Sequence, residues 1–262
     1  MSGPGAKVVA LPDFTLEGKV AVVTGGSGSI GAATAAALIR QGAAVAIVGR
    51  TPKALKEVAA KLSVGGRTVL PVRADCTSEP EMQELAGEVT ARLGPADILC
   101  TFAGGDGMPL PTHEETAAHW RRVTDSELTS TFATIRAFLP AMLERHSGTI
   151  VTMASSAARQ AAGSSAAYAA AKAGVIALSR HLAGEYARQG IRVNCLAPSA
   201  VENERMRRWM SEEERRALGG AFPLGRLGQP EDVAAATVFL ASSASSWITG
   251  LTLDISGGKV ML

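Results

Sequence analysis

The sequence predicts an α/β fold, in which a doubly wound parallel sheet of about seven strands carries helices on both faces. Short runs of apolar, mostly β-branched residues alternate along the chain with longer helical segments. Most of these runs are continuously apolar, which is typical of strands buried on both faces of a parallel sheet. No linker, repeat or low-complexity segment interrupts the alternation. We therefore expect a single domain over residues 16–262, preceded by a flexible extension at residues 1–15.

Each element is expected from its local pattern. Three helices end just before Gly42, Gly94 and Gly190, where a residue with positive φ commonly follows a helix. The expected strands are residues 20–24, 45–48, 68–72, 97–101, 148–153, 191–196 and 251–255. The expected helices are residues 30–41, 52–62, 79–93, 114–145, 166–189 and 230–242.

The composition excludes several classes of protein. Apolar residues make up 47% of the 262 residues and the net charge is +2, which excludes intrinsic disorder. The chain has no block of Lys and Arg, so we expect no nucleic-acid partner. Cys76, Cys100 and Cys195 are odd in number and widely spaced, which indicates a reducing compartment, no disulfide framework and no metal site.

Two segments of the sequence bear on targeting and membrane insertion. The first residues contain no apolar core of the length that a signal peptide needs. Residues 233–253 carry no charge, but serine, threonine and glycine interrupt them, so we expect helix, loop and strand rather than a membrane span. The sequence therefore predicts a cytoplasmic protein with no membrane partner.

Residues 199–223 interrupt the alternation of strands and helices. This segment is longer than an ordinary link, and Met206, Trp209 and Met210 have the spacing of one helix face. It is either a surface helix with an apolar underside or a substrate lid at the carboxyl ends of the strands.

A glycine-rich turn joins the first strand to the first helix. Residues 24–31 read Thr-Gly-Gly-Ser-Gly-Ser-Ile-Gly. Glycines let the backbone approach a pyrophosphate, and the helix N-terminus supplies free N–H groups and a partial positive charge. The turn at this junction predicts a dinucleotide site, although a tight turn without a ligand is the alternative.

The end of the second strand favours NADP(H) over NAD(H). An NAD site usually places an acidic residue there, to accept from the ribose 2′-hydroxyl. Here no acid occurs between Gly42 and Lys56, and Arg50 offers a fork of donors that suits a 2′-phosphate. Asp75, after the third strand, is placed either to accept from the adenine amino group or to begin a turn.

Three further residues suggest a set that polarises a carbonyl group. Tyr168 and Lys172 are one helical turn apart and project from the same face, and Ser155 ends the preceding strand. We expect Ser155 to donate to the substrate oxygen and Tyr168 to exchange its proton. A lysine charge about 5 Å away, at an effective dielectric constant of about 20, favours the phenolate by roughly 3 kcal/mol. Such a phenol is suited to acid–base catalysis near neutral pH.

Motifs of one known family extend over nearly the whole chain, from about Leu16 onward. They are residues 24–31, Asp75, Ala103-Gly104, Ser155, Tyr168 with Lys172, residues 190–194 with Pro198, residues 223–232, 248–250 and 256–258. With these motifs the chain resembles the short-chain dehydrogenase/reductase family, and in particular its bacterial 3-oxoacyl-acyl-carrier-protein reductases.

The resemblance implies a Rossmann-type fold and hydride transfer from reduced nicotinamide to a carbonyl carbon. It implies that Lys172 also holds the nicotinamide ribose and that the backbone around Val201 binds the carboxamide. It further implies a homotetramer, formed partly through the helices at residues 114–145 and 166–189, and an acyl carrier protein as a candidate partner. The resemblance and the charge argument together give the expected cofactor-binding residues. These are Gly25, Ser27, Ser29, Ile30, Gly31, Arg50, Asp75, Cys76, Phe102, Ala103, Gly104, Tyr168, Lys172, Val201 and Asn203.

Several positions depart from the family pattern. Ser29 stands where a motif glycine is usual, and Thr101-Phe102 replaces an Asn-Asn pair whose amides brace the central strand. Ser199 replaces a glycine after Pro198, and Asn203 replaces a threonine expected near the cofactor.

Glu127 is the departure with the largest expected consequence. The family usually has asparagine here, as a fourth catalytic residue that holds a water connecting Lys172 to solvent. A glutamate still offers its backbone carbonyl for that role, but its carboxylate near Lys172 partly cancels the charge that acidifies Tyr168. We expect turnover that is slowed but not abolished, relative to a Glu127→Asn variant.

The leading interpretation is an NADPH-dependent ketone reductase. The alternatives are a non-catalytic NADP-binding regulator on the same fold and an NAD-dependent alcohol dehydrogenase. We expect residues 106–112, 156–164 and 199–222 to form the substrate entrance. Its apolar side chains suggest an acyl chain or a ring as substrate, whereas Arg159 and Arg205 would contact an acidic group or water. These apolar residues are Met108, Leu110, Met206, Trp209, Met210 and Phe222.

Overall fold

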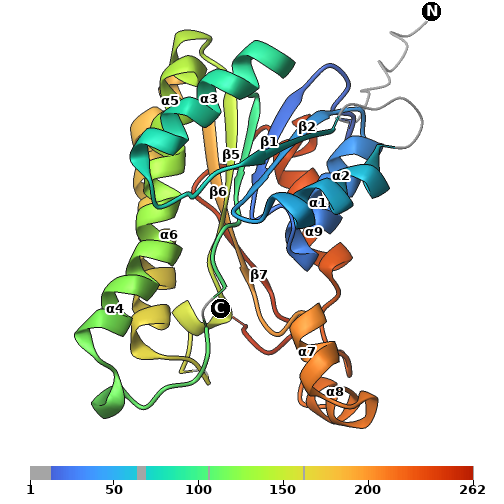
Figure 1. The fold of residues 1–262 in the computed structure, drawn as a ribbon, viewed down its shortest axis with the longest axis vertical. Helices are drawn as coiled ribbons and strands as arrows, with labels where there is room; N and C mark the ends of the chain where they lie inside the picture. Colours follow the sequence, from blue (N-terminus) through green and yellow to red (C-terminus); the bar gives the residue numbers. More distant parts are fainter. Residues whose placement is uncertain (1–12, 64–68, 106, 162, 262) are drawn as a thin grey trace, which may run out of the picture.

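A seven-stranded parallel sheet forms the centre of the molecule (Figure 1). The computed structural model describes residues 13–63, 69–105, 107–161 and 163–261. The strand order is β3-β2-β1-β4-β5-β6-β7, and every neighbouring pair is parallel, which confirms the predicted fold class. The strands are β1 (Val20–Thr24), β2 (Ala44–Gly49), β3 (Val69–Arg73), β4 (Ile98–Thr101), β5 (Gly148–Met153), β6 (Ile191–Pro198) and β7 (Thr252–Ile255).

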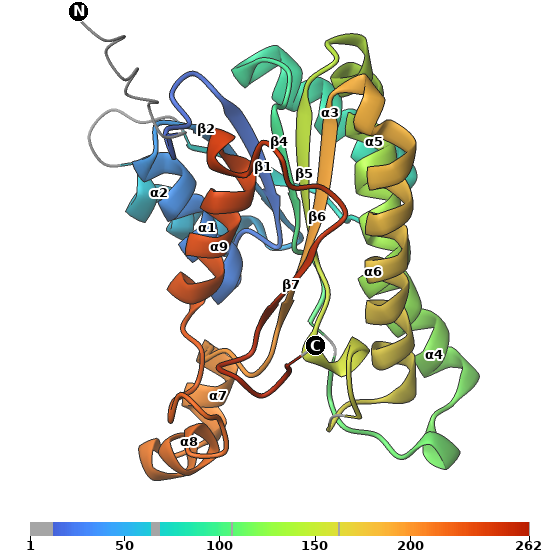
Figure 2. The same ribbon diagram turned by 180° about the vertical axis from the view of Figure 1, so that it is seen from behind.

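Helices cover both faces of this sheet, as Figures 1 and 2 show from opposite sides. One face carries α1 (Ser29–Arg40), α2 (Pro52–Leu62) and α9 (Pro230–Ala241). The other face carries α3 (Glu79–Leu93), α5 (Ser130–Glu144) and α6 (Ala166–Tyr186). None of the described helices combines the length and the apolar character that a membrane span requires.

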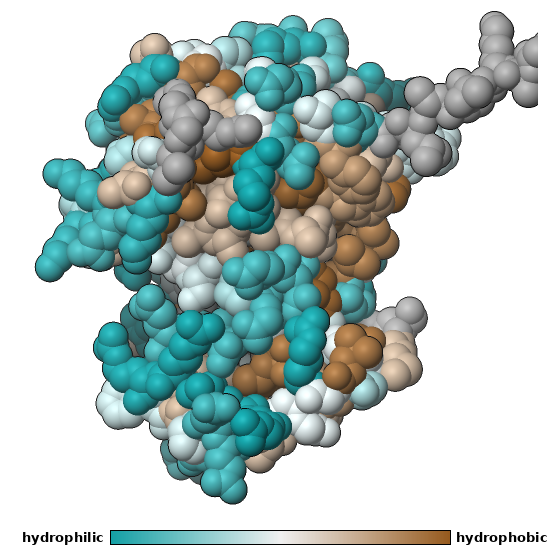
Figure 3. Space-filling view, turned by 90° about the vertical axis from the view of Figure 1, so that its right-hand side faces the viewer, coloured by the Kyte–Doolittle hydropathy of each residue, from teal (hydrophilic) through white to brown (hydrophobic). Residues whose placement is uncertain are grey.

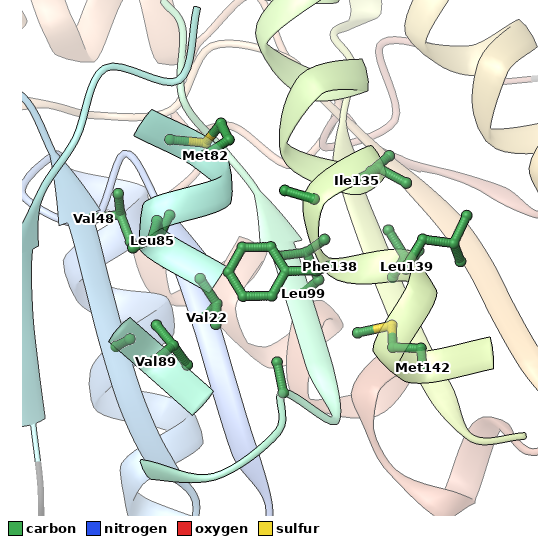
Figure 4. Close-up of a cluster of buried hydrophobic side chains, with 14 of the residues drawn as sticks. Val22, Val48, Met82, Leu85, Val89, Leu99, Ile135, Phe138, Leu139 and Met142 are labelled. Carbon is green, nitrogen blue, oxygen red and sulfur yellow. The ribbon is translucent and has the colours of Figure 1, made fainter. Parts of the chain in front are cut away.

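Alternate side chains of each strand supply the two cores. Val22 and Leu99 point toward α3 and α5, where Phe138 packs against them (Figure 4). Ala21 and Val23 point to the opposite face, toward α1 and α9. Because both faces are buried, every residue of β1 is buried, which explains its continuously apolar sequence.

The helix expected at residues 114–145 begins only at Ala117, which corrects its start, and its helical backbone contains a π-helical turn. A 3-10 turn at Thr112–Glu114 precedes α4 (Ala117–Thr124), which begins where the Thr116 side chain caps the His119 N–H at 3.1 Å. A π-helical turn, Asp125–Thr129, then separates α4 from α5. Hydroxyl groups bond back to carbonyls of this turn, such as Ser130 Oγ to the Ser126 carbonyl at 2.6 Å. Serine and threonine side chains of this kind often disturb a helix locally.

Residues 199–223 form two short helices rather than one. These are α7 (Glu204–Trp209) and α8 (Glu212–Gly219). Ser211 and Glu214 form a reciprocal capping box that starts α8 and so separates the two. At the end of α6, a 3-10 turn (Ala187–Gln189) leads to Gly190 at φ +78°.

The other predicted boundaries agree with the structure to within one or two residues. Gly42 and Gly94 both have positive φ, as expected for residues that follow a helix. Residues 1–12 of the expected N-terminal extension lie outside the described residues, as do Thr68, Asp106 and Ala162.

Candidate active site

A cavity of about 1640 Å³ opens at the carboxyl ends of the strands. Figure 1 shows α4 and α7 on opposite sides of this end of the sheet. Ser155 and Glu127 line the cavity, together with every residue expected to bind the cofactor. Those residues are Gly25, Ser27, Ser29, Ile30, Gly31, Arg50, Asp75, Cys76, Phe102, Ala103, Gly104, Tyr168, Lys172, Val201 and Asn203.

The glycine turn after β1 is shaped by close backbone contacts. Gly25 has φ +67°, and a Cβ atom there would lie 2.6 Å from the Phe102 carbonyl oxygen. Gly31 packs directly against the Gly25 carbonyl, so neither position accepts a side chain. Gly28 begins α1 without a side-chain cap, and no acid lies in the first turn of the helix. This arrangement fits a dinucleotide diphosphate, because the helix N-terminus keeps its N–H groups and its positive partial charge for an anion.

Ser29 replaces the usual motif glycine without strain. It is the first residue of α1, where helical dihedral angles suit any residue type.

The expected 2′-phosphate contact has a suitable environment. Arg50 follows β2, is exposed and lines the cavity. Asp75 also lines it, but its Oδ1 accepts from the Thr77 N–H at 3.0 Å and from Thr77 Oγ1 at 2.8 Å. These bonds, with Arg50 and Arg73 nearby, hold the pKa of Asp75 below its usual value. The Asp75 carboxylate is thus an element of the turn as well as of the cavity wall.

Thr24 braces the central strands where the family usually has asparagines. Its Oγ1 accepts from the N–H groups of Phe102 and Ala103, both at 3.0 Å, and donates to the Cys100 carbonyl at 3.4 Å. Thr101 Oγ1 is buried and has no hydrogen-bond partner among the described residues. A side chain of β1 therefore braces the end of β4 through backbone groups.

Tyr168 and Lys172 project from the first turns of α6 toward the end of β5. Ser165 caps this helix, and its Oγ accepts from the Tyr168 N–H at 3.2 Å. Lys172 Nζ lies 5.6 Å from the centre of the Tyr168 ring and donates to the Met153 carbonyl at 2.8 Å. The Ser155 side chain accepts from the Ala157 N–H at 3.2 Å, which fixes its orientation at the end of β5.

Glu127 forms a direct, buried ion pair with Lys172. Its Oε2 lies 2.8 Å from Lys172 Nζ, and both side chains are almost fully buried. Its Oε1 accepts from the Gly105 N–H at 2.7 Å and from Ser126 Oγ at 3.3 Å. Gly104, at φ +130°, packs so tightly against the carboxylate that a Cβ atom has no room.

The ion pair changes the electrostatics of the lysine. Burial is the largest single effect and lowers the pKa of Lys172, but the Glu127 carboxylate and Tyr168 together raise it, so the pKa lies above that of a free lysine. The π-helical turn places the Glu127 carboxylate in direct contact with the Lys172 ammonium group.

At the end of β6, Val201 forms an isolated bridge with Gly228. The side chain of Asn203 caps α7 instead of remaining free. Its Oδ1 accepts from the Met206 N–H at 2.9 Å, and its Nδ2 donates to the Val201 carbonyl at 3.1 Å. Asparagine is favoured at this capping position. Asn203 therefore borders the cavity with both its amide oxygen and its amide nitrogen already in hydrogen bonds to the backbone.

The expected substrate entrance needs three corrections. Arg159 is turned away from the cavity, because its Nε lies 3.2 Å from Asp254 Oδ1 and its Nη2 donates to the Thr252 carbonyl. Phe222 is buried, and Lys259 Nζ lies 4.8 Å from the centre of its ring. Leu110 is not among the lining residues.

The other side chains named for the entrance line the cavity. They are Met108, Arg205, Met206, Trp209 and Met210. Trp209 is 77% exposed, so it is not part of a buried helix underside. The space-filling view shows a mostly hydrophilic outer surface over α7 and α8, where charged residues gather (Figure 3).

The sequence analysis did not single out some groups that line or support the cavity. Lys259 lines it, the buried carboxylate of Glu115 contacts the start of α6, and Ser165 caps that helix. Of these, only Ser165, three residues before Tyr168, carried a recognisable local signal, that of a helix cap.

Comparison with known proteins identifies the family. A family model described as enoyl-(acyl carrier protein) reductase matches residues 25–259. A cis-4-hydroxycyclohexanecarboxylate dehydrogenase of Sinomonas cyclohexanicum is 38% identical over 240 residues, which cover 92% of this chain and 96% of the relative. The chain belongs to the short-chain dehydrogenase/reductase family. It is thus an oxidoreductase by family, and the resemblance predicted from the sequence is confirmed.

Two further members of this family bear on the cofactor and the site. The 3-oxoacyl-[acyl-carrier-protein] reductase of Escherichia coli is 34% identical, covering 95% of this chain and all of that protein. An NADPH-bound short-chain oxidoreductase of Pseudomonas aeruginosa PAO1, described as containing an atypical catalytic centre, is 34% identical with a TM-score of 0.90. The match covers 95% of this chain and 100% of that one. NADP(H) is the cofactor that the comparisons support.

Proposed function

We propose that the protein is an NADPH-dependent reductase that converts a ketone to an alcohol. The observation that carries this proposal is that Ser155, Tyr168 and Lys172 line one cavity with the glycine turn of α1. NADPH, when bound, supplies a hydride to the carbonyl carbon. The protein must then supply a proton to the carbonyl oxygen and hold that oxygen in place.

The side chains divide this work. Ser155 donates a hydrogen bond to the substrate oxygen, which polarises the carbonyl group. Tyr168 delivers the proton to that oxygen as general acid. Lys172 supplies positive charge 5.6 Å from the phenol ring and contributes to binding the cofactor ribose. Gly25, Gly31 and the N-terminus of α1 hold the diphosphate, and the backbone near Val201 holds the carboxamide.

Arg50 is proposed to select NADPH by pairing with the 2′-phosphate. We expect Arg50→Ala to weaken NADPH binding about 10- to 100-fold, which corresponds to the loss of charge-assisted hydrogen bonds. NADH binding should change less than about twofold, because NADH carries an uncharged 2′-hydroxyl where NADPH has the phosphate. Fluorescence titration of both cofactors measures this, with Arg40→Ala as the control, since Arg40 is exposed at the far end of α1. Equal losses for both cofactors would assign Arg50 a general structural role.

The substrate is proposed to be an apolar ketone or a β-ketoacyl thioester. Met108, Met206, Trp209 and Met210 provide the apolar part of the cavity wall. We propose that residues 199–223 close over the substrate, because α7 carries Met206 and Trp209 and Met210 follows it directly. A β-ketoacyl thioester tests the acyl-carrier-protein reductase activity that the resemblance suggests.

The protein is also proposed to form a homotetramer through α5, the α4 helix beside it, and α6. Large apolar side chains are exposed on the described surface, including Trp120 on α4 and Phe132 on α5. Light scattering after gel filtration measures the mass directly, and a monomer at micromolar concentration would contradict this proposal.

Cofactor binding followed by turnover tests the main proposal. NADPH and NADH binding are measured first, and oxidation of the preferred cofactor is then followed with a panel of ketones and a β-ketoacyl thioester. We expect tight NADPH binding with turnover of at least one ketone. Tight binding without turnover of any carbonyl would favour the non-catalytic regulator, and preferred NADH binding would favour the alcohol dehydrogenase.

A further inference from the structure

Glu115 is a buried carboxylate in a surface connection. It lies between β4 and α4, directly after the 3-10 turn Thr112–Glu114, yet its side chain is only 3% exposed. Its neighbour Glu114, by contrast, is 59% exposed. Burying a carboxylate is unfavourable unless hydrogen bonds or charges satisfy it, so its partners explain why it is there.

The partners of Glu115 lie at the start of the helix that carries Tyr168 and Lys172. Both carboxylate oxygens accept from the Ala167 N–H, at 3.3 Å and 3.2 Å. Oε1 also lies 2.8 Å from Nδ1 of His119, one turn further along the chain. The negative charge therefore lies at the N-terminus of α6, where the helix dipole favours it.

This contact completes the capping of the first turn of α6. Ala167 donates to Glu115, and the next N–H, that of Tyr168, donates to Ser165 Oγ. Two consecutive backbone donors beside the proposed acid are thus fixed by side chains. Ser165 belongs to the segment that leads into α6, whereas Glu115 is 52 residues away in the sequence.

The connection that bears Glu115 also touches the Tyr168 ring. A Cβ atom on Gly107 would lie 3.0 Å from both Cε1 and Cζ of that ring. The same connection includes Gly105, whose N–H donates to Glu127. It therefore meets the site at Glu127, at the Tyr168 ring and at the start of α6.

We propose that Glu115 is a positioning residue for Tyr168. Its carboxylate docks the β4–α4 connection onto the first turn of α6, so that the phenol and the cavity wall at Gly107 keep one relative position. Glu115 does this by accepting a hydrogen bond from the Ala167 N–H, and His119 orients the carboxylate. The effect on turnover rests on the proposed function, in which Tyr168 is the proton donor, whereas the docking itself does not.

Three variants test the proposal: Glu115→Ala, Glu115→Gln and, as a matched control, Glu114→Ala. Glu115→Ala should lower kcat about 10- to 100-fold, in the range expected when a reacting group is displaced by about 1 Å. KM for NADPH should stay within about twofold, because the residues proposed to hold its diphosphate and 2′-phosphate lie on other elements. Glu115→Gln should recover kcat to within about threefold of the wild type, because its amide oxygen still accepts from Ala167. Glu114→Ala should match the wild type.

Hydrogen–deuterium exchange separates this inference from the proposed function. The first turn of α6 should exchange faster in Glu115→Ala than in the wild type or in Glu115→Gln, whether or not a substrate is known. If the wild type reduces no carbonyl, the proposed function fails, and the exchange result alone decides the docking.

The inference is overturned by any of three results. One is unchanged exchange at the start of α6 in Glu115→Ala. Another is a Glu115→Ala enzyme with wild-type kcat, even if its melting temperature falls, because Glu115 then contributes only to stability. A Glu115→Gln enzyme as slow as Glu115→Ala would also contradict it, since hydrogen-bond acceptance would not be the property that matters.

Discussion

Glu127 and Lys172 place opposite charges in contact beside the proposed proton donor. The 2.8 Å separation and the burial of both side chains leave no space for a solvent layer between them. Lys172 is thereby held as a cation, because the raised pKa keeps it protonated over the physiological pH range. The same carboxylate partly cancels the field that Lys172 exerts on Tyr168.

Replacing Glu127 by asparagine should therefore speed the reaction. In Glu127→Asn the lysine charge acts on the phenol without the opposing carboxylate, and we expect kcat to rise about three- to tenfold, or up to about 1.4 kcal/mol in barrier. Steady-state rates with saturating NADPH and ketone, measured across the pH range, check this. Glu144→Asn, at the exposed end of α5, is the control. An equal or lower kcat at every pH would reject this role for Glu127.

The sequence predicted residues whose role follows from local spacing. Tyr168 and Lys172, at i and i+4, line the cavity, as do Gly25, Gly28 and Gly31 of the glycine-rich turn. It could not predict bonds between distant segments. Arg159 pairs with Asp254, 95 residues away, and Glu115 bonds to Ala167, because only the folded chain brings these groups together.

At the scale of elements, α9 depends on a capping interaction at its start. Asp232 Oδ2 accepts from the Gln229 N–H at 2.7 Å and lies 2.7 Å from Nη1 of Arg226. The hydrogen bond to Arg226 is the main cause that lowers the pKa of Asp232, and the Gln229 N–H adds to it. Because the folded-state pKa is depressed, this stabilisation is present above the ordinary carboxyl pKa and is lost as the pH falls through the folded-state value.

Asp232→Asn should lower the free energy of unfolding by about 1 kcal/mol at neutral pH, a typical value for a helix cap. The difference from the wild type should shrink as the pH falls below about 4, where the wild-type carboxyl group protonates. Urea unfolding at a series of pH values measures both quantities, with the exposed neighbour Glu231→Gln as control. The account would be contradicted by a difference in unfolding free energy that stays constant down to pH values at which Asp232 of the wild type is protonated in both the folded and the unfolded state.

The late start of the helix expected at residues 114–145, and its π-helical turn, show why boundaries were harder to predict than elements. The apolar periodicity persists through the π-helical turn, so the sequence indicates one long helix. Within this turn, Glu127 contacts Lys172 and the Gly105 N–H, which lie far from it in the sequence and come together only in the folded protein. Strand limits were more reliable, because the apolar runs end where the sheet ends.

At the scale of the whole molecule, Arg192 on β6 joins the two C-terminal elements to the sheet. Its guanidinium donates to the carbonyls of Leu240, Ser242 and Ile248 and to the hydroxyls of Thr149 and Ser245, at 2.8 to 3.3 Å. Burial lowers the pKa of Arg192, which fits a cation that is satisfied by neutral acceptors.

Arg192→Met should destabilise the protein by about 3 kcal/mol or more, because it leaves several partly buried acceptors without a donor. Arg192→Lys should recover only part of this loss, since an ammonium group cannot reproduce the planar fork. Equilibrium unfolding in urea gives these values, and Arg188→Met, at an exposed position, is the control. A loss below about 1 kcal/mol for Arg192→Met would show that water replaces the guanidinium without penalty.

The sheet as a whole was predictable because all seven strands are apolar enough to stand out from the helices. Their order in space is a separate matter, because periodicity does not say which strands are neighbours. The order β3-β2-β1-β4-β5-β6-β7 is that of a doubly wound sheet, and it comes from the structure rather than from any single residue.

The central claim is that this fold delivers a proton from Tyr168 to a ketone that accepts hydride from NADPH. The most direct test compares ketone-dependent NADPH oxidation by the wild type and by Tyr168→Phe, with NADPH binding measured on both. We expect the variant to bind NADPH within about threefold of the wild type and to lose roughly 100- to 10,000-fold in kcat, the usual contribution of a general acid. A Tyr168→Phe enzyme that reduces the same ketone at the wild-type rate would contradict the account.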